Sequence, residues 1–276
     1  MFEEGVIPLD IWVSRFVDWL VNNHRDIFQA IKWPIEQTLN GLDHGLNAVH
    51  PIIVIVVVAI AAWRFSGVGL SVFSVVSMVF IGLLGMWADT MTTLAMVLSS
   101  VLFCCLAGIP LGILAARSQR FDSVLRPVLD AMQTTPAFVY LVPIVMLFSV
   151  GNVAGVLATI VFAMPPITRL TNLGIRQVHP ELVEAAQAFG ATEWQVLVRV
   201  QIPLALPTIL AGLNQTIMMA LSMVVIAALI GAGGLGSPVI LGLNTLDIGL
   251  AVVGGLGIVL IAMVLDRITQ SMAQKK

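Results

Sequence analysis

The sequence predicts an all-α integral membrane protein with about seven transmembrane helices, and two observations lead to that fold class. Apolar residues make up 59% of the 276 residues, charged residues only 10%, and the mean hydropathy is +1.02. A soluble domain carries about 25% charged residues, so this chain could not cover its core with a polar surface. In addition, the apolar residues gather in runs that approach the roughly 20 residues a spanning helix needs.

Seven segments are expected to form these spans, although some are short: 47–63, 67–87, 91–116, 136–149, 153–168, 207–231 and 247–265. Only the stretch from Ser149 to Asn152 separates the fourth from the fifth. Its Gly151-Asn152 pair is a turn signal, which favours two spans over the main alternative, one long merged helix. Cys104 and Cys105 are adjacent within the third segment and lack the spacing of a disulfide or a zinc site. We therefore expect both to be packing residues.

Residues 1–46 are predicted to form an amphipathic tail outside the cytoplasm. Apolar residues recur in it at helical spacing in two groups, Ile11, Trp12, Phe16, Trp19 and Leu20, and then Ile27, Ile31, Ile35, Leu39, Leu42 and Leu46. Such helices lie on a membrane surface or pack against the bundle, and a packed scaffold is the simplest interpretation. Residues 1–25 lack the basic start, apolar run and cleavage pattern of a secretory signal, so we expect the tail to be retained.

The basic residues predict the orientation, because cytoplasmic loops carry an excess of lysine and arginine. If the C-terminus is cytoplasmic, all but three of the 13 basic residues are cytoplasmic: Arg64, Arg117, Arg120, Arg126, Arg169, Arg176, Arg199, Arg267, Lys275 and Lys276. The outer loops near 88–90, 151–152 and 232–246 contain none. We therefore predict an outer N-terminus and a cytoplasmic C-terminal tail, 266–276. Residues 47–88 would then form two accessory spans in front of a transport domain over 89–265.

Ionisable residues are absent from the interiors of the predicted spans, with Asp247 only at the edge of the last one. An ion-coupled secondary carrier usually keeps such a group in the membrane, so this class is disfavoured. A phosphate-binding loop needs a lysine after glycine, and neither Lys32 nor the C-terminal lysines fit that motif. We expect no enzyme activity and no metal site, because no nucleophile–base pair or ligand spacing stands out. Energy for transport would come from a partner at the cytoplasmic face.

The segment 178–207 predicts two short helices joined by a glycine. Pro180 suits the first turn of a helix, and Gly190 occupies the position of a left-handed C-terminal cap. Thr192 and Gln195 have the spacing of a capping box at the start of a second helix. That helix is expected to carry Trp194 and Leu197 as contact residues and to end at Pro203. From this pattern alone, an ordinary amphipathic connector remains an alternative.

The residues of this segment resemble the EAA loop of binding-protein-dependent ABC importers. The resemblance rests on Glu184-Ala185-Ala186, Gly190 and the run from Val200 to Pro203, with the usual spacing. Val200 and Ile202 replace the usual isoleucine and leucine, which is a mild departure. The resemblance implies that the loop docks into a cleft of a cytoplasmic ATPase. It assigns this coupling role to Glu184, Ala185, Ala186, Gly190, Glu193, Trp194, Leu197 and Pro203.

Further segments are similar to the glycine betaine/proline betaine permeases: 129–143, 165–178, 212–219, 222–227 and 231–236. This resemblance implies a type I ABC importer permease in the cell inner membrane, importing compatible solutes for osmoprotection. It also implies a second permease copy, two ATPase subunits and an extracytoplasmic solute-binding protein as partners, besides membrane lipid. ATP and Mg would bind the ATPase, with no cofactor on this chain and no nucleic-acid partner. A permease for amino acids is the main alternative.

The translocation path is expected to involve the sixth span, and its candidate residues are Asn214, Thr216, Met219, Ser222 and Met223. Polar groups at membrane depth need a partner or a wet cavity, so helix–helix hydrogen bonds are an equal alternative for these residues. Quaternary ammonium groups favour aromatic faces, and the chain has one tyrosine, Tyr140. Selectivity among betaines, choline and carnitine is therefore expected in the binding protein.

Overall fold

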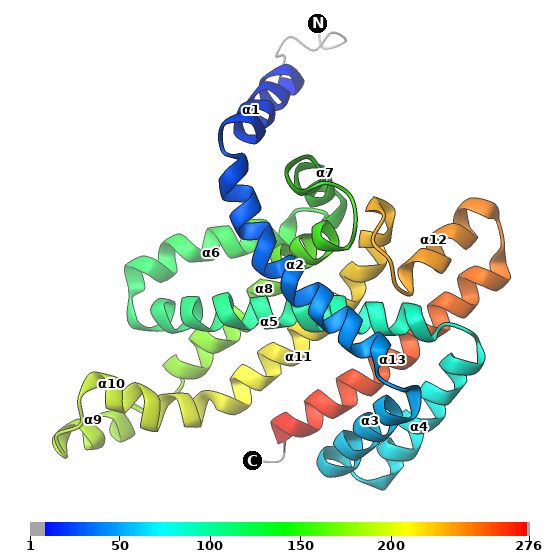
Figure 1. The fold of residues 1–276 in the computed structure, drawn as a ribbon. Helices are drawn as coiled ribbons and strands as arrows, with labels where there is room; N and C mark the ends of the chain where they lie inside the picture. Colours follow the sequence, from blue (N-terminus) through cyan, green and yellow to red (C-terminus); the bar gives the residue numbers. More distant parts are fainter. Residues whose placement is uncertain (1–8, 275–276) are drawn as a thin grey trace, which may run out of the picture.

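The computed structural model describes residues 9–274, and within that range every regular element is a helix (Figure 1). This confirms the all-α prediction. The helices are α1 (Leu9–Asn23), α2 (Arg25–Ala48), α3 (Pro51–Ser66), α4 (Val68–Leu83), α5 (Trp87–Arg117), α6 (Gln119–Thr134), α7 (Ala137–Phe148), α8 (Asn152–Arg176), α9 (Pro180–Ala188), α10 (Glu193–Val196), α11 (Ile202–Ala227), α12 (Gly236–Thr245) and α13 (Ile248–Gln274). A π-helical turn, Leu197–Gln201, joins α10 to α11, and a 3-10 turn, Ala228–Ile230, follows α11.

Four continuous helical segments are long and apolar enough to cross a membrane: 87–117, 152–176, 193–230 and 248–272. Two further spans arise if α2 with α3 and α6 with α7 each count as one, although the pairs bend by 106° and 100°. The helix at the predicted second span, α4, is shorter, with 16 residues. The one at the predicted fourth span, α7, has only 12. A helix of that length extends about 18 Å, less than the hydrocarbon core, so α7 cannot cross alone.

Ser149 and Gly151 separate α7 from α8, which excludes one merged helix. Both residues have positive φ, 70° and 122°. Glycine adopts such a conformation without a steric penalty, whereas Ser149 does so at some cost. The predicted break at this position is therefore confirmed.

The centre of the molecule is formed by α5, α8 and α11, which pack closely through small residues. A Cβ atom on Gly112 of α5 would lie 2.6 Å from the Thr168 carbonyl oxygen of α8. One on Gly108 would lie 2.7 Å from the Ile167 side chain. Such contacts bring two helix backbones together and replace the hydrophobic driving force that is weak between helices in lipid. Gly108 and Gly112 are therefore sites of close helix packing.

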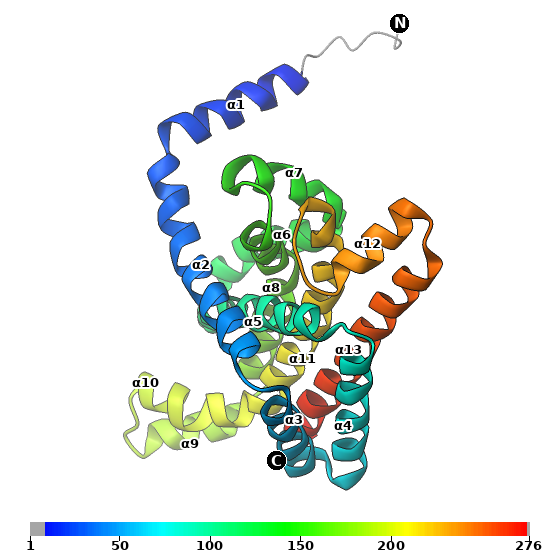
Figure 2. The same cartoon turned by 45° about the vertical axis from the view of Figure 1, so that its right-hand side comes forward.

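The two helices predicted in the N-terminal tail are present and differ in their surroundings. Ile35 and Leu39 of α2 are buried against the bundle, where α2 crosses α5. In contrast, α1 extends away from the bundle in Figure 2, and the apolar face with Trp12, Phe16 and Trp19 is exposed. The acidic residues Glu3 and Glu4 of the predicted tail, and the C-terminal lysines, lie outside the described residues.

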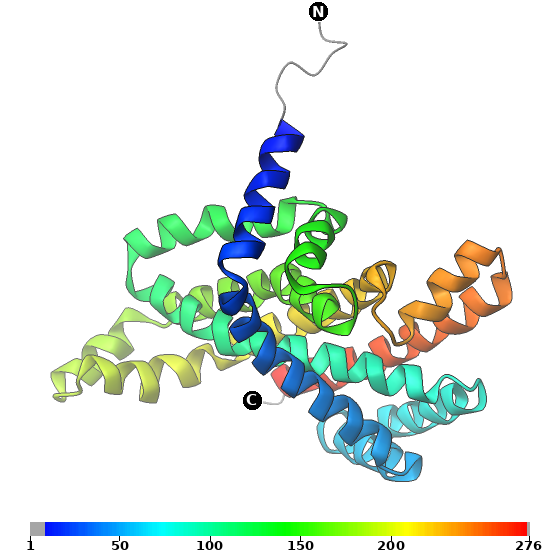
Figure 3. The same ribbon diagram turned by 45° about the horizontal axis from the view of Figure 1, so that its top comes forward.

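Residues 232–246, expected to be an outer loop, contain a helix. The apolar run after Gly236 forms α12, which lies beside the first half of α13 in Figure 3, at the opposite end of the molecule from α9 and α10. The preceding glycine-rich turn is fixed by two side chains from other helices. Thr93 of α5 accepts a hydrogen bond from Leu235 N at 2.8 Å, and Asn152 of α8 accepts one from Gly233 N at 2.6 Å.

Candidate functional site

The segment that resembles the EAA loop, hereafter the coupling loop (residues 178–207), begins with α9. Pro180 occupies its first turn, and the helix ends before Gly190. Gly190 has φ +85°, and its amide donates a hydrogen bond to the Gln187 carbonyl oxygen at 2.8 Å. The left-handed cap predicted at Gly190 is therefore confirmed. An added Cβ would meet no atom within 4 Å, so there is room for a side chain. Glycine is favoured here by the positive φ alone.

The second helix begins with the predicted capping box. Gln195 N donates to the Thr192 hydroxyl at 3.3 Å, and Thr192 N donates to the Gln195 side-chain oxygen at 2.9 Å. Two backbone donors that a helix start leaves unpaired are thereby satisfied. The capping box fixes α10 directly after the glycine turn.

The expectation that Pro203 ends this helix is wrong. The helical path continues from Glu193 to Ile230, and Pro203 lies in the first turn of α11. In the π-helical turn ahead of it, Ile202 N donates to the Leu197 carbonyl oxygen, five residues back. A proline clashes with the carbonyl four residues earlier in an α-helix, and the wider turn relieves that clash. The coupling loop is thus continuous with the span that carries the candidate path residues.

The side chains of the coupling loop divide into an outer and an inner group. Trp194 is 66% exposed and Phe189, which the sequence did not single out, is 93% exposed. Leu197, expected as a contact residue, is only 1% exposed and belongs to the core. Glu184, Ala185 and Glu193 are exposed, and Ala186 is half-buried. Large apolar side chains exposed at a loop tip mark a contact surface for another protein.

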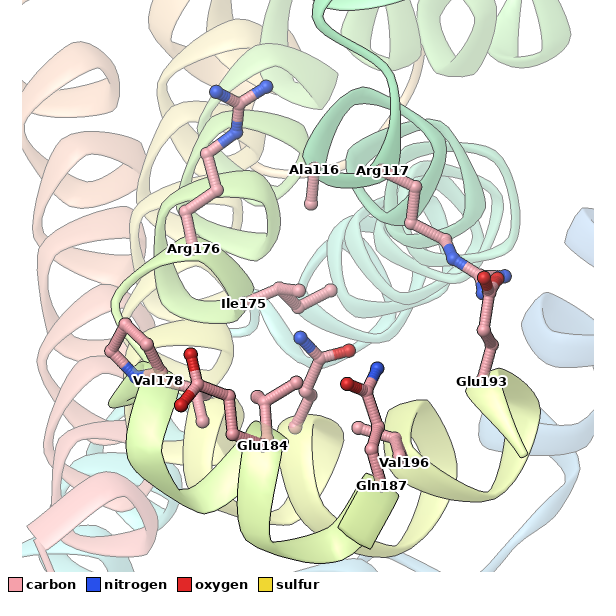
Figure 4. A pocket seen from close by; sticks show the side chains of 12 residues that line it. Ala116, Arg117, Ile175, Arg176, Val178, Glu184, Gln187, Glu193 and Val196 are labelled. Atoms are coloured by element: carbon pink, nitrogen blue, oxygen red, sulfur yellow. The ribbon is translucent and has the colours of Figure 1, made fainter. Parts of the chain in front are cut away.

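A polar cavity of about 510 Å³ lies between the coupling loop and the ends of α5 and α8 (Figure 4). Glu184 and Gln187 of α9 line it from one side, and Arg117, the last residue of α5, lines it from the other. Arg117 donates to Glu193, the first residue of α10, at 2.9 Å. This ion pair links the second half of the coupling loop to the end of α5.

A second link joins the end of α8, which leads into the loop, to α6. Asp122 in the first turn of α6 is 2% exposed, and its carboxylate lies 2.6 Å from Arg126 and 3.3 Å from Arg176. Asn172 of α8 donates to the same carboxylate at 2.8 Å. In Figure 4 the guanidinium of Arg176 points away from α9. In the sequence, Arg117, Arg126 and Arg176 served only as indicators of the membrane orientation. Asp122 was not singled out there.

Arg176 also contacts the end of α5 and the start of α6. It donates to the Ala115 carbonyl oxygen at 2.7 Å and to the Gln119 side chain at 3.0 Å. The only sequence signal for this cluster is the spacing of Asp122 and Arg126, four residues apart on one helix face. Nothing in the sequence indicated that Arg176 would complete it, because that contact is tertiary.

The candidate path residues of α11 lie in different environments. Asn214 donates to Asp266 of α13 at 3.1 Å and accepts from Thr269, so it links two helices. Thr216 and Met223 are fully buried, Met223 against Leu141 and Ala158. Met219 is half-buried, and its sulfur lies 3.8 Å from the Gln133 side-chain nitrogen of α6. Ser222 is exposed on the helix surface. Of the five, Ser222 is exposed and Asn214 and Met219 are half-buried, and of these three only Asn214 is tied to another helix by two side-chain hydrogen bonds.

Comparison with known proteins shows which family this chain resembles. The chain is 54% identical over 273 residues to the glycine betaine/proline betaine transport system permease protein ProW of Escherichia coli (strain K12), covering 99% of this chain and 77% of that protein. It is 45% identical to the glycine betaine transport system permease protein OpuAB of Bacillus subtilis (strain 168), covering 98% of this chain and 96% of that one.

The fold is shared with a methionine ABC transporter, MetNI, in an inward-facing conformation. The TM-score is 0.56 at 25% sequence identity, and the match covers 66% of this chain and 90% of the MetNI chain. Residues 108–276, which include the whole coupling loop, match a family described as the inner membrane component of binding-protein-dependent transport systems. This chain, a multi-pass inner membrane permease subunit and not an enzyme, belongs to that family.

Proposed function

We propose that this chain forms the translocation pathway of an ATP-driven importer of compatible solutes of the glycine betaine type. The observation that carries the proposal is the coupling loop, which presents exposed Trp194 and Phe189 at the end of a rigid helical path. The substrate class is supported by the names of the relatives, which transport glycine betaine, proline betaine and carnitine. The transport domain would occupy residues 89–265, behind two accessory spans.

The energy for transport would come from two copies of a cytoplasmic ATPase, which binds ATP and Mg. Glu184, Ala185, Ala186, Gly190, Glu193 and Trp194 would dock there, with Leu197 and Pro203 joining the loop rigidly to α11. Closure of the ATPases would move the coupling loops together and open the spans to the outside. An extracytoplasmic binding protein would then deliver the solute, and hydrolysis would reset the cycle.

A second copy of the chain would complete the path. Ala211, Gln215, Met218 and Ser222 of α11 form an exposed stripe at helical spacing. Two of these are polar, and Ser222 donates to the Met218 carbonyl oxygen at 3.1 Å. The Gln215 amide is the group that calls for a partner or a wet cavity at membrane depth. A homodimer that faces these stripes toward each other would provide both, with Met219 and Ser222 beside the solute.

Competition for uptake tests the substrate class. The chain is reconstituted with its ATPase and binding protein in proteoliposomes, and ATP-dependent uptake of labelled glycine betaine is measured. Excess proline betaine or carnitine should reduce uptake, whereas methionine or histidine should not. The latter two represent amino-acid importers, which are supported only by the fold shared with MetNI. Strong inhibition by amino acids alone would contradict the proposal, as would uptake that persists on an ion gradient without ATP.

A further inference from the structure

The coupling loop and the end of α8 that leads into it are both fixed to the same corner of the structure, formed by the end of α5 and the start of α6 (residues 115–122). Arg176 is the last residue of α8, and only residues 177–179 separate it from α9. Its guanidinium bonds to Ala115 and Gln119 and pairs with Asp122. Within the loop, the Arg117–Glu193 ion pair joins the same corner to α10. Displacement of the loop would therefore act on this corner and, through Arg176 at the end of α8, on the start of α6.

The other end of α6 contacts the candidate path. Arg169 of α8 pairs with Asp130 and donates to Gln133 at 2.9 Å. Gln133 in turn contacts the sulfur of Met219 in α11. Polar contacts thus run from the coupling loop, along α6, to a path residue. Pro127 removes one backbone hydrogen bond in the middle of α6, so the helix would transmit displacement through its remaining hydrogen bonds and its packing against α5 and α8.

We propose that α6 is a strut that transmits the state of the ATPase from the coupling loop to Met219, and that Asp122 is the positioning residue that fixes α6 to the end of α8, just before the loop begins. This proposal rests on the proposed function, since it assumes that residues 178–207 dock on the ATPase. The burial of Asp122 supports it. A carboxylate at 2% exposure is costly to bury without charged partners. Arg126 of α6 itself supplies one, and Arg176 supplies the one that comes from α8.

Asp122→Asn tests the strut, because it removes the charge that holds Arg176 and preserves the size of the side chain. In the reconstituted complex with glycine betaine as solute, the variant should retain ATPase co-purification and basal hydrolysis. Stimulation of hydrolysis by the loaded binding protein, and solute imported per ATP, should fall about tenfold, within the range of coupling between distant sites. The ratio of solute to ATP separates this role from general destabilisation, which lowers the yield of complex but not the ratio.

Arg176→Lys provides a variant that retains the charge in case Asp122→Asn does not fold. Lysine keeps the attraction to Asp122 but cannot reach Ala115 and Gln119 with a guanidinium fork, so the ratio should fall by a smaller factor. Asp247→Asn is the matched control. Asp247 is exposed at the start of α13, where it accepts from Leu250 N, and asparagine caps a helix as well as aspartate does. Its ratio should equal that of the wild type.

A double-mutant cycle tests transmission along α6 directly. Asp122→Asn and Met219→Leu alter contacts at opposite ends of α6 that share no partner, and independent sites combine additively in free energy. If α6 transmits the signal, the solute imported per ATP should fall much less in the double variant than the product of the two single-variant factors. Independent effects, or an unchanged ratio in both Asp122→Asn and Arg176→Lys, would overturn the proposal. Failure of the proposed function would be distinct, since the wild-type complex itself would then show no ATP-dependent uptake.

Discussion

Two glycines of this chain are required for opposite physical reasons. Gly190 lies in open space but has φ +85°, so a side chain there would strain the backbone. Gly112 has an ordinary helical backbone, but Thr168 and Thr171 leave no room for a Cβ. The first glycine shapes the surface that would meet the ATPase, and the second sets the distance between α5 and α8. Substitutions at the two positions should therefore affect different properties.

Gly190→Asp should weaken ATPase binding without preventing insertion. The left-handed backbone costs a non-glycine residue roughly 1 kcal/mol, and the new charge lies in the proposed docking surface. Co-purification of the ATPase and uptake in proteoliposomes should therefore fall together. Asn244→Asp, an exposed change on α12, is the control and should leave both unchanged. Full ATPase binding and full uptake by Gly190→Asp would remove the coupling role from this loop.

Gly112→Ala should destabilise the helix bundle. Its Cβ would lie 2.6 Å from both the Thr168 carbonyl oxygen and the Thr171 Cβ, so α5 and α8 would have to separate. Overpacking of this kind costs about 1–3 kcal/mol and should lower the thermal unfolding temperature in detergent. Gly255→Ala in α13 is the control, because its Cβ would meet nothing within 4 Å and alanine favours the helix. Equal unfolding temperatures for the two variants would contradict the packing argument.

At the scale of single elements, most local features of the coupling loop follow from its sequence, whereas its tertiary contacts do not. The glycine cap and the capping box of the coupling loop are local, so Gly190, Thr192 and Gln195 were predictable. The end of a helix at Pro203 was the expected local outcome as well, but the π-helical turn overrides it. The burial of Leu197 depends on packing against distant helices, and no spacing within the loop indicates it. The contact of Asp122 with Arg176 is likewise tertiary, so the sequence did not predict it.

The capping box makes a prediction for the stability of α10. Thr192→Ala removes the acceptor for Gln195 N, and loss of such a cap costs about 1 kcal/mol. Because α10 is short and exposed, the loss should appear as local fraying. Hydrogen exchange of the Gln195 and Val196 amides should accelerate about fivefold, following the free-energy relation for local opening. Thr245→Ala, at the exposed end of α12, should leave these two amides unchanged. Unchanged exchange in Thr192→Ala would show that packing, not the cap, holds α10.

At the scale of the whole molecule, the hydropathy pattern predicted where helices lie but not how each one meets the bilayer. All seven expected segments contain a helix, and α12 was missed because its apolar run is short and glycine-rich. The bends between α2 and α3 and between α6 and α7, 106° and 100°, have no counterpart in an apolar run. A proline follows each break, at Pro51 and Pro136, which is a sign of a boundary but not of its angle.

The predicted orientation can be tested by labelling single cysteines in a variant whose Cys104 and Cys105 are replaced by serine. A cysteine at Leu246, at the end of α12, should react with a membrane-impermeant maleimide added to intact cells, because this end is predicted to lie outside. A cysteine at Phe189 should react only after permeabilisation. Both native side chains are highly exposed, so steric access does not limit either reaction. Labelling of both positions in intact cells would refute the orientation.

The π-helical turn at Leu197–Gln201 also sets the rotation of α11 about its axis relative to α10. Each residue of an α-helix advances the side chains by about 100° around the axis, so one residue more or less turns everything beyond it by that amount. Deleting one residue from this turn would leave α9, α10 and α11 individually intact. It would rotate α11 about its axis relative to Trp194, so that Ser222 and Met223 would face different neighbours. The turn thus sets the rotational position of the helix face with Ser222 relative to the exposed side chain of Trp194.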